Sequence, residues 1–440
     1  MEKNKNIGLV AYVLISLTCA VVVGTVLMML VYLLPASAVR KNMNTSIYIY
    51  EQEGDYYNWA PWREGSMLDN FTDSLMLNIA AFPGTGSAVI DAMKNYWVFY
   101  PELEAQVGGR RVPHLLRTLK SDAYDSGTFK EYPRYWHGYL IWLKPLLCIT
   151  DFANIRILNM YIQLALLILI MIELYKISGY KTVIPFFFSM LIINPVSTVL
   201  CMQYACMYHI SLISVLILLK RKLYVSRNQW KLFLWIGIAT AFFDLLTYPI
   251  VALCTSLLLL VVLNEEPIPM QIQKIFLNTF VWLIGYAGMW GGKWIVCYLI
   301  TGELAGGLKG VIYRLMGDPT QEAPNIKMNF FHVLKLNFNQ VWKEPMLWIY
   351  LICLLLPIML LITRRYRLIR FQSMIPTLMI GCYPFAWYFF VRNHSAIHVF
   401  FTHKNLAVTV LAVGFCIANS FTVNSDPKSV VRNSYRMKNK

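Results

Sequence analysis

The stretch GLVAYVLISLTCAVVVGTVLMMLVYLL, residues 8–34, decides the fold class. It follows a short polar and basic start, and it runs for more than 20 residues without a charged side chain. About 20 apolar residues suffice to cross the hydrocarbon of a bilayer, whereas the core of a cleaved signal peptide is shorter. We therefore expect residues 1–34 to be a retained signal anchor whose N-terminus is cytoplasmic.

The composition of the whole chain agrees with a protein that lies largely in lipid. Of its 440 residues, 58% are hydrophobic and only 14% are charged, against about 25% charged in a soluble domain. The nine cysteines show no metal-ligand spacing and lie mostly in apolar runs, so we expect buried thiols rather than disulfides. Basic cytoplasmic loops account for the net charge of +16, and we expect no nucleic-acid partner.

Ten apolar runs approach the length of a membrane span. They lie at about residues 8–34, 154–174, 182–202, 204–219, 231–248, 250–264, 275–300, 346–363, 373–391 and 405–423. An eleventh run, Gly138–Thr150, is shorter and contains Lys144 and Pro145. Because runs of that length are more often interfacial, we expect it to lie along the membrane surface.

Charge fixes the direction of the spans, because cytoplasmic loops carry an excess of Lys and Arg. With ten spans, the basic residues gather in the connections 175–181, 220–230, 265–274 and 364–372 and in both tails. The short turns near residues 202 and 249, on the opposite side, carry no Lys or Arg. We call that opposite side the outer side, and we expect both termini to be cytoplasmic.

This topology divides the chain into six segments. They are the signal anchor 1–34, an outer loop 35–153, a transmembrane bundle 154–300, a second outer loop 301–345, C-terminal spans 346–423 and a basic tail 424–440. The first loop is too long to be unstructured, and its apolar periodicity predicts helices at Met67–Phe82 and Val112–Leu119. We expect an all-α polytopic helical membrane protein of about ten transmembrane helices with a large helical first outer loop.

Histidine marks the outer side as the functional one. All seven histidines fall on that side or near the outer ends of spans: His114, His137, His209, His332, His394, His398 and His403. Histidines and carboxylates near a membrane surface are candidates for proton transfer and phosphate binding.

Two carboxylates of the first outer loop are the leading catalytic candidates. Asp69 and Asp73 are four residues apart and so share one face of the expected helix. They can act as base and orienting group or hold a divalent cation. The alternative is a plain helix start that Asp stabilises through the dipole. Asp55, in a sequence typical of a turn, is a weaker candidate.

Cationic and aromatic residues supply the candidates for phosphate binding. Arg134 can bind a phosphate with two hydrogen bonds, while Tyr135 and His137 suit a headgroup belt or a sugar face; an aromatic anchor is the alternative. A second group gathers in one short outer loop and favours anion binding over plain loop polarity; it comprises Arg392, His394, His398, His403 and Lys404.

Two further candidates lie inside expected spans. Asp244, in the segment that ends at Tyr248 and Pro249, is a functional hypothesis because acidic residues within spans are rare; an Asp that orders helix packing is the alternative. Lys293 lies in the outer half of its span, where it can reach a phosphate or extend to the interface.

The arrangement resembles the C-type (GT-C) membrane glycosyltransferases, and within them bacterial polytopic proteins. The likeness is a first span, a large outer loop with short helices and an acidic motif, and then many spans. At residue level it rests on Asp69 and Asp73 and on the segments Arg134–His137, Asp244–Tyr248 and Arg392–Lys404.

The resemblance implies a reaction and a place for it. A polyprenyl-phosphate sugar would be the donor, and a glycan, lipid or protein outside the plasma (inner) membrane would be the acceptor, as in cell-envelope polysaccharide biosynthesis. Asp73 would act as general base. Arg134, Lys293 and the Arg392–Lys404 loop would stabilise the phosphate leaving group.

Other functions fit the same sequence. A polysaccharide polymerase or ligase acting on lipid-linked glycans would use the same cations and depend less on carboxylates. A transporter or lipid flippase would be expected to show internal repeats and charges at mid-membrane, and the sequence shows no repeat. A structural assembly protein would leave the clustered His and Asp unexplained.

Overall fold

The computed structural model of the protein describes residues 2–120, 127–264, 266–306, 312, 329–342, 366–368 and 374–423. The expected span 346–363, most of the second outer loop 301–345 and the tail 424–440 lie outside the described residues.

Helices make up most of the described chain. The first group is α1 (Glu2–Tyr32), α2 (Ala36–Asn44), α3 (Tyr48–Glu53), η1 (Glu64–Ser66), α4 (Asn70–Ala80), α5 (Ala88–Lys94), α6 (Pro101–Val107), α7 (Val112–Lys120) and α8 (Leu140–Ile149). The second is α9 (Phe152–Ser178), α10 (Tyr180–Ile193), α11 (Pro195–Leu200), α12 (Met202–Lys220), η2 (Leu223–Val225), α13 (Trp230–Phe243), α14 (Ile250–Val262) and α15 (Ile268–Thr301). The third is α17 (Phe330–Asn339), α19 (Ile375–Gly381), α20 (Tyr383–Phe390), α21 (Arg392–Ile397), α22 (Val399–Thr402), η5 (His403–Asn405) and α23 (Leu406–Ser420).

Among the described residues, strands form two short antiparallel pairs. β1 (Trp97–Phe99) pairs with β2 (Thr128–Lys130), with Val98 opposite Phe129. β3 (Tyr366–Leu368) pairs with β4 (Phe421–Val423). The all-α class expected from the sequence is therefore confirmed.

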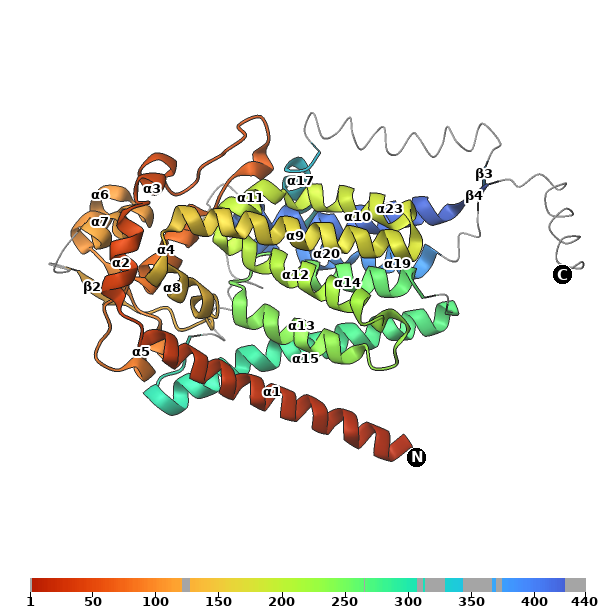
Figure 1. Ribbon diagram of the computed structural model, residues 1–440, viewed down its shortest axis with the longest axis horizontal. Coiled ribbons are helices and arrows are strands. Elements are labelled where there is room, and N and C mark those ends of the chain that lie inside the picture. The colour runs from red at the N-terminus through yellow and green to blue at the C-terminus, as the bar shows by residue number, and fades with distance from the viewer. Residues whose placement is uncertain are drawn as a thin grey trace, which may run out of the picture.

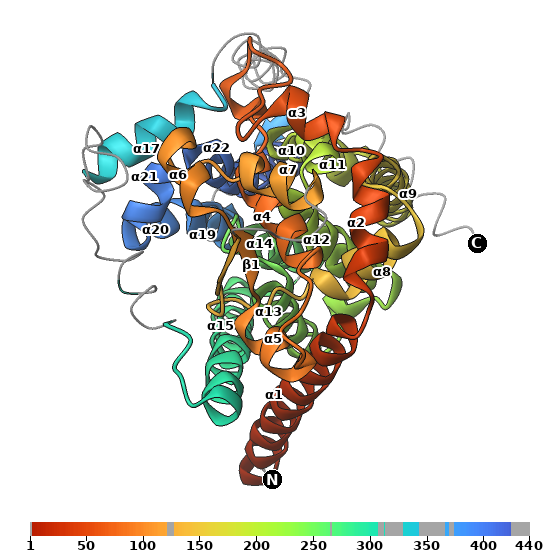
Figure 2. The same ribbon diagram turned by 90° about the vertical axis from the view of Figure 1, so that its left-hand side faces the viewer.

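The helices form a long bundle with a cap at one end (Figure 1). The cap consists of residues 36–149, from α2 to α8 with β1 and β2, and it falls within the expected outer loop 35–153. The start of α1 and the end of α23 both lie at the opposite end of the bundle. Figure 2 looks onto the cap and shows α4 near its centre, in front of α12.

Several helices of the bundle are long and apolar enough to cross a membrane. These stretches are Gly8–Tyr32, Phe152–Ser178, Met202–Lys220, Ile268–Thr301 and Val399–Asn419. Shorter apolar helices accompany them at Leu140–Ile149, Tyr180–Ile193, Trp230–Phe243, Ile250–Val262 and Ile375–Phe390. The protein is thus a helical membrane protein, and the count of ten spans stays a prediction.

Two expected spans are interrupted for identifiable reasons. The run 182–202 breaks after α10, where Asn194 takes a left-handed conformation with φ 62° and Pro195 begins α11. Asparagine tolerates that conformation, and a residue before proline is disfavoured in a helix. The run 373–391 breaks at Cys382, two residues before Pro384 in the first turn of α20, because proline cannot donate the helical hydrogen bond.

The short run 138–150 forms α8, which has ten residues. At 1.5 Å per residue the helix is about 15 Å long, half of the roughly 30 Å of bilayer hydrocarbon. It packs against α1 and α2 at the cap end. This length agrees with the expected interfacial placement.

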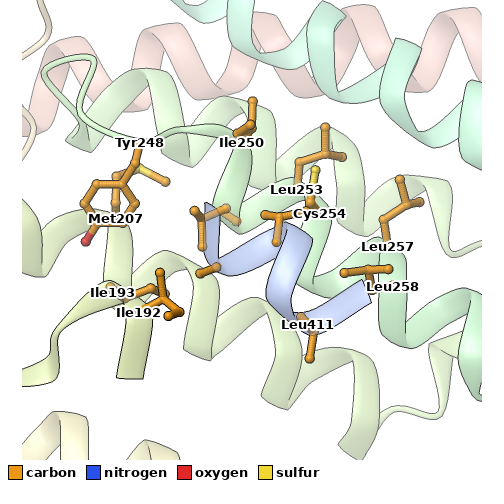
Figure 3. Packing of buried hydrophobic residues seen from close by; sticks show 14 of the residues in the cluster. Ile192, Ile193, Met207, Tyr248, Ile250, Leu253, Cys254, Leu257, Leu258 and Leu411 are labelled. Atoms are coloured by element: carbon orange, nitrogen blue, oxygen red, sulfur yellow. The ribbon is translucent and has the colours of Figure 1, made fainter. Parts of the chain in front are cut away.

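Close helix packing holds the bundle together. α13 and α15 meet at glycines: a Cβ atom on Gly237 would overlap the carbonyl oxygen of Trp282, and one on Gly285 would overlap that of Leu234. Small residues permit this close approach in membrane helices. Elsewhere α14 packs against α23, and Leu257, Leu258 and Leu411 are buried in one hydrophobic cluster (Figure 3).

Candidate functional site

A buried polar cluster lies where the cap meets the starts of α9 and α12. It brings together side chains from two cap helices and two bundle helices. They are Tyr50, Glu53, Asp69, Asn70, Asp73, Arg156 and Gln203. We call these seven residues the polar centre.

Asp73 joins the cap to α12. Its Oδ2 accepts a hydrogen bond from the backbone N–H of Met202 at 2.7 Å, and its Oδ1 accepts one from Gln203 at 2.8 Å. These are orphan donors of the first turn of α12, and the helix dipole favours a carboxylate there. Burial raises the pKa of Asp73 to about 6, and these hydrogen bonds and the Arg156 charge oppose the rise.

Asp69 caps the N-terminus of α4, and α4 lies within the helix expected at Met67–Phe82. Its Oδ1 accepts the backbone N–H of Thr72 at 3.1 Å. Burial raises the pKa of Asp69 to about 7, and the nearby charges of Asp73 and Asp55 add to the rise. A carboxylate that titrates near neutral pH is suited to general-base catalysis.

Arg156 and Glu53 form a two-pronged ion pair inside the polar centre. The two terminal nitrogens of Arg156 lie 2.6 and 2.8 Å from the two carboxylate oxygens of Glu53. The guanidinium also stands 5.1 Å from the ring centre of Phe152. The side-chain nitrogen of Asn70 donates to Glu53 at 2.8 Å and to the carbonyl of Gly54 at 3.0 Å.

The polar centre also holds buried polar atoms without a hydrogen-bond partner among the described residues. They are Tyr50 Oη, Asn70 Oδ1, Arg156 Nε and Gln203 Oε1. Buried polar groups are ordinarily paired, so four unpaired atoms in one cluster are a signal for a polar ligand.

An apolar cavity of about 310 Å³ adjoins the polar centre at Arg156, which belongs to both. Its lining comes from α8, α9, α12 and their neighbours: Trp142, Leu146, Phe152, Ile155, Arg156, Leu158, Asn159, Ile162, Val199, Met202, Ala205, Cys206, His209, Ile210, Ile213 and Phe243. Leu158, Ile162 and Ile213 are 40, 41 and 45% exposed, so the cavity opens on the side of the bundle. It is therefore a lateral apolar pocket with Arg156 in its wall, and it also contains Met202, whose backbone N–H donates to Asp73.

Sequence reasoning missed Arg156 and Glu53. A signal for Arg156 was available, because this arginine lies inside the expected span 154–174 and charged residues within spans are functional hypotheses. Asn159 and Gln163 follow on the same helix, where Gln163 binds Asn159 and both bind the carbonyl of Thr198. No local pattern pointed to Glu53.

Some other expected site residues gather around Tyr204 of α12. The hydroxyl of Tyr248 donates to the carbonyl of Tyr204. The ammonium of Lys404 lies 4.7 Å from the Tyr204 ring centre and donates to the carbonyl of Ile193 at 2.8 Å, at the end of α10. Asp244 accepts from the backbone of Thr247 at 2.9 Å. These contacts match the helix-ordering alternative for Asp244.

The histidine-rich segment packs beside that group. Nε2 of His394 lies 2.6 Å from the carbonyl of Leu246, a residue in the left-handed region with φ 69°. The rings of His394 and His398 are 4.7 Å apart. Nδ1 of His403 lies 2.9 Å from the carbonyl of Val399. Arg392 lies over the ring of Phe389 at 5.5 Å. His209 lies about 10 Å along α12 from its start, inside the bundle.

Arg134, Tyr135, His137 and Lys293 form another group, at the cap end of α15. The indole of Trp294 donates to the carbonyl of Arg134 at 3.1 Å, and Tyr135 packs edge-on against Trp290. Both ring nitrogens of His137 are engaged, by the Tyr139 hydroxyl and the Tyr132 carbonyl. Burial, with the Lys293 charge, lowers the pKa of His137 to about 3. Lys293 donates to the carbonyl of Ala92 at 3.0 Å.

Asp55 lies outside these groups and caps α7. Its Oδ1 accepts the backbone N–H groups of Arg111 at 2.7 Å and Val112 at 3.1 Å. The turn expected around Asp55 therefore serves the second expected helix, Val112–Leu119.

Asp69 and Asp73 could also hold a divalent cation, as their spacing in the sequence allowed, but no ready ligand set surrounds them among the described residues. In the described parts of the chain, no group of three or more His, Cys, Asp or Glu side chains is arranged to hold a metal ion.

Comparisons with protein-family models, curated proteins and solved structures find no match for this chain.

Proposed function

We propose that the protein is a membrane glycosyltransferase that moves a sugar from a polyprenyl-phosphate donor to an acceptor glycan, lipid or protein. One observation carries the proposal: the lateral apolar cavity is lined by Arg156 and by Met202, whose backbone N–H donates to the carboxylate of Asp73 in the polar centre. A polyprenyl-phosphate sugar joins a long apolar chain to an anionic linkage and a hydroxyl-rich ring. The cavity suits the chain, and the polar centre suits the phosphate and the sugar.

In this proposal Asp69 is the general base. Its raised pKa suits it to take the proton of the acceptor hydroxyl. The hydroxyl oxygen then forms a bond to the anomeric carbon while the bond from that carbon to the phosphate oxygen breaks. The phosphate leaves with the electron pair, and the Arg156 guanidinium stabilises its charge. Direct attack of this kind inverts the configuration.

Asp73 takes a positioning role in the same proposal. Both of its oxygens already accept backbone hydrogen bonds from the start of α12. Those bonds favour the charged carboxylate and make it a weaker base. We therefore assign the role of general base to Asp69 and not to Asp73, which the resemblance had suggested.

The proposed orientation puts the cap on the outer face of the plasma (inner) membrane. The start of α1 and the end of α23 lie together at the opposite end (Figure 1). The basic connections 175–181 and 220–230 favour a cytoplasmic side. Donor and acceptor would then meet outside the membrane, with both chain ends inside.

Transfer of labelled sugar by the purified full-length protein tests the proposal. Nanodiscs would hold the wild type, Asp69→Asn, Asp73→Asn and the control Asp151→Asn, with a panel of polyprenyl-phosphate sugars. Asp151 caps α9 by accepting the N–H of Asn154 at 2.8 Å, so its amide variant matches the chemistry of the change. We expect transfer by the wild type and Asp151→Asn and none by Asp69→Asn.

Two outcomes would change the proposal. Transfer that survives in Asp69→Asn and vanishes in Asp73→Asn would return the base to Asp73. If the folded wild type transfers sugar from no donor, the glycosyltransferase proposal is overturned, and uptake or lipid flipping in proteoliposomes becomes the measurement to make.

A further inference from the structure

We propose that Arg156 recognises the phosphate of the lipid ligand and that Glu53 is a resident anion, which this phosphate displaces from Arg156. The inference rests on the proposed function for the kind of lipid. It adds a built-in competitor for Arg156, which the transfer reaction itself does not require.

The position of Arg156 supports a role in recognition. Among the residues that line the cavity, Arg156 is the one with a permanent charge. It lies at the end nearest the cap, because its partner Glu53 closes helix α3 of the cap. An anion on a lipid whose chain fills the cavity would therefore meet Arg156 first.

The geometry of the ion pair matches phosphate binding. Two guanidinium nitrogens face two carboxylate oxygens at 2.6 and 2.8 Å, and arginine binds carboxylate and phosphate with the same fork. The third nitrogen of the Arg156 guanidinium, Nε, is buried and has no hydrogen-bond partner among the described residues. Glu53 thus occupies the fork that a phosphate would use, and one further donor stays unused.

Charge requires exchange rather than addition. The pair is neutral as it stands, and an added phosphate would place a second anion beside Glu53 in a setting of low dielectric, where repulsion is strong. Breaking the pair without replacement would leave a buried charge alone, which is strongly destabilising. The phosphate must therefore take the place of Glu53.

Glu53 is the partner that is free to move. Its side chain is 15% exposed against 9% for Arg156, and Arg156 is held against Phe152. Glu53 is the last residue of the six-residue helix α3 and precedes Gly54, whose φ is 63°. Asn70 donates to the Glu53 carboxylate and to the Gly54 carbonyl. The Glu53 carboxylate can therefore keep its hydrogen bond from Asn70 after it leaves Arg156.

Equilibrium binding to the full-length protein in nanodiscs tests the exchange. The probes are a polyprenyl phosphate, the matching polyprenol and inorganic phosphate, which separate headgroup, chain and free anion. The variants are Glu53→Gln and Arg156→Gln. Glu173→Gln is the control, because Glu173 also lies on α9 and pairs with Lys220 at 2.8 Å and Lys176 at 3.0 Å.

Removing the competitor should strengthen binding. We expect Glu53→Gln to bind the polyprenyl phosphate about tenfold more tightly than wild type, the effect of freeing one charged hydrogen-bonding partner. Arg156→Gln should bind polyprenyl phosphate no better than polyprenol, and Glu173→Gln should match the wild type. Inorganic phosphate should bind weakly to all, since it lacks the chain.

Other results would overturn the inference. Binding to Glu53→Gln that equals or falls below that of Glu173→Gln would make the pair purely structural. Glu53→Gln leaves the buried charge of Arg156 without its counter-charge and can lower stability. Glu53→Asp keeps the negative charge on a side chain one methylene shorter, so it is measured beside Glu53→Gln and should bind at least as tightly as wild type. Weaker binding by Glu53→Asp would also contradict the exchange.

The same preparations separate the two proposals. Arg156-dependent binding without any sugar transfer would sink the glycosyltransferase proposal and keep the exchange. Transfer that proceeds without Arg156-dependent binding would keep the enzyme and sink the exchange.

Discussion

The carboxylate of Asp73 accepts the backbone N–H of Met202 at 2.7 Å, across 129 positions of the chain. One residue belongs to α4 of the cap and the other begins α12 of the bundle. The bond therefore fixes the cap onto the helix whose first residue also lines the cavity. It makes the position of Asp69, four residues earlier, depend on the start of α12.

Removing this carboxylate should destabilise the protein. Asp73→Ala leaves two buried N–H groups of α12 without an acceptor, which costs about 1–3 kcal/mol. Asp73→Asn keeps one oxygen acceptor and should cost less. Thermal unfolding in detergent measures both, with Ser87→Ala as control, since Ser87 caps the exposed start of α5 through a longer 3.4 Å bond. Equal stability of Asp73→Ala and Ser87→Ala would contradict the role of Asp73 as a joint.

The stability of the folded protein should depend on pH partly through the titration of Asp69. Its pKa is raised to about 7 in the folded protein from an ordinary value of 3.8, so the folded state holds a proton that the unfolded state has already lost. Stability should therefore fall as pH rises from about 4 to about 7 and then level off. Asp69→Asn should flatten this slope. Unfolding at a series of pH values measures it, and an unchanged slope in the variant would contradict the assigned pKa.

The pH dependence of transfer should run the opposite way. A general base must be ionised, so the proposed activity should rise with pH through about 7. Initial rates at saturating donor check this expectation. A rate that is flat between pH 5 and pH 8 (a range of about three units around neutrality) would remove Asp69 from the role of base.

The sequence predicted what depends on local pattern. Apolar length located the helices that now form the bundle, and periodicity located α4 and α7 in the cap. The four-residue spacing of Asp69 and Asp73 indicated that they share a face of one helix, and both lie in the polar centre. The breaks at Asn194 and Cys382 were readable from the adjacent prolines but were outweighed by the apolar runs around them.

What the sequence could not predict depends on long-range contacts. Glu53 and Arg156 are 103 positions apart, and neither segment reveals the other. The sequence suggested Lys293 and Lys404 as phosphate ligands. In the structure each donates to a backbone carbonyl in the last turn of a helix. Their shared preference for helix C-termini is physical, and only the fold shows which termini they reach.

Substitution of His209 can show which end of a bound lipid, its chain or its headgroup, lies deeper in the cavity. This histidine lines the cavity about two turns along α12 from Met202, and its buried Nε2 has no hydrogen-bond partner in the part of the chain that the structure describes. If the chain fills this part, His209→Leu should strengthen binding of polyprenol and polyprenyl phosphate alike, because an apolar wall replaces a polar one. Loss of the preference for polyprenyl phosphate over polyprenol would instead put the headgroup beside His209, and Arg156 would not be the phosphate site.

The contact between α13 and α15 should tolerate no added side-chain atom. Gly237→Ala would drive its Cβ into the Trp282 carbonyl, and because that atom belongs to the backbone the two helices must separate, at about 1–3 kcal/mol. Gly291→Ala is a matched control on α15, since nothing lies within 4 Å of its Cβ, and alanine favours a helix over glycine by up to about 1 kcal/mol. Thermal unfolding of the two variants should therefore move in opposite directions. A Gly237→Ala protein as stable as Gly291→Ala would mean that α13 and α15 are not held at this glycine contact.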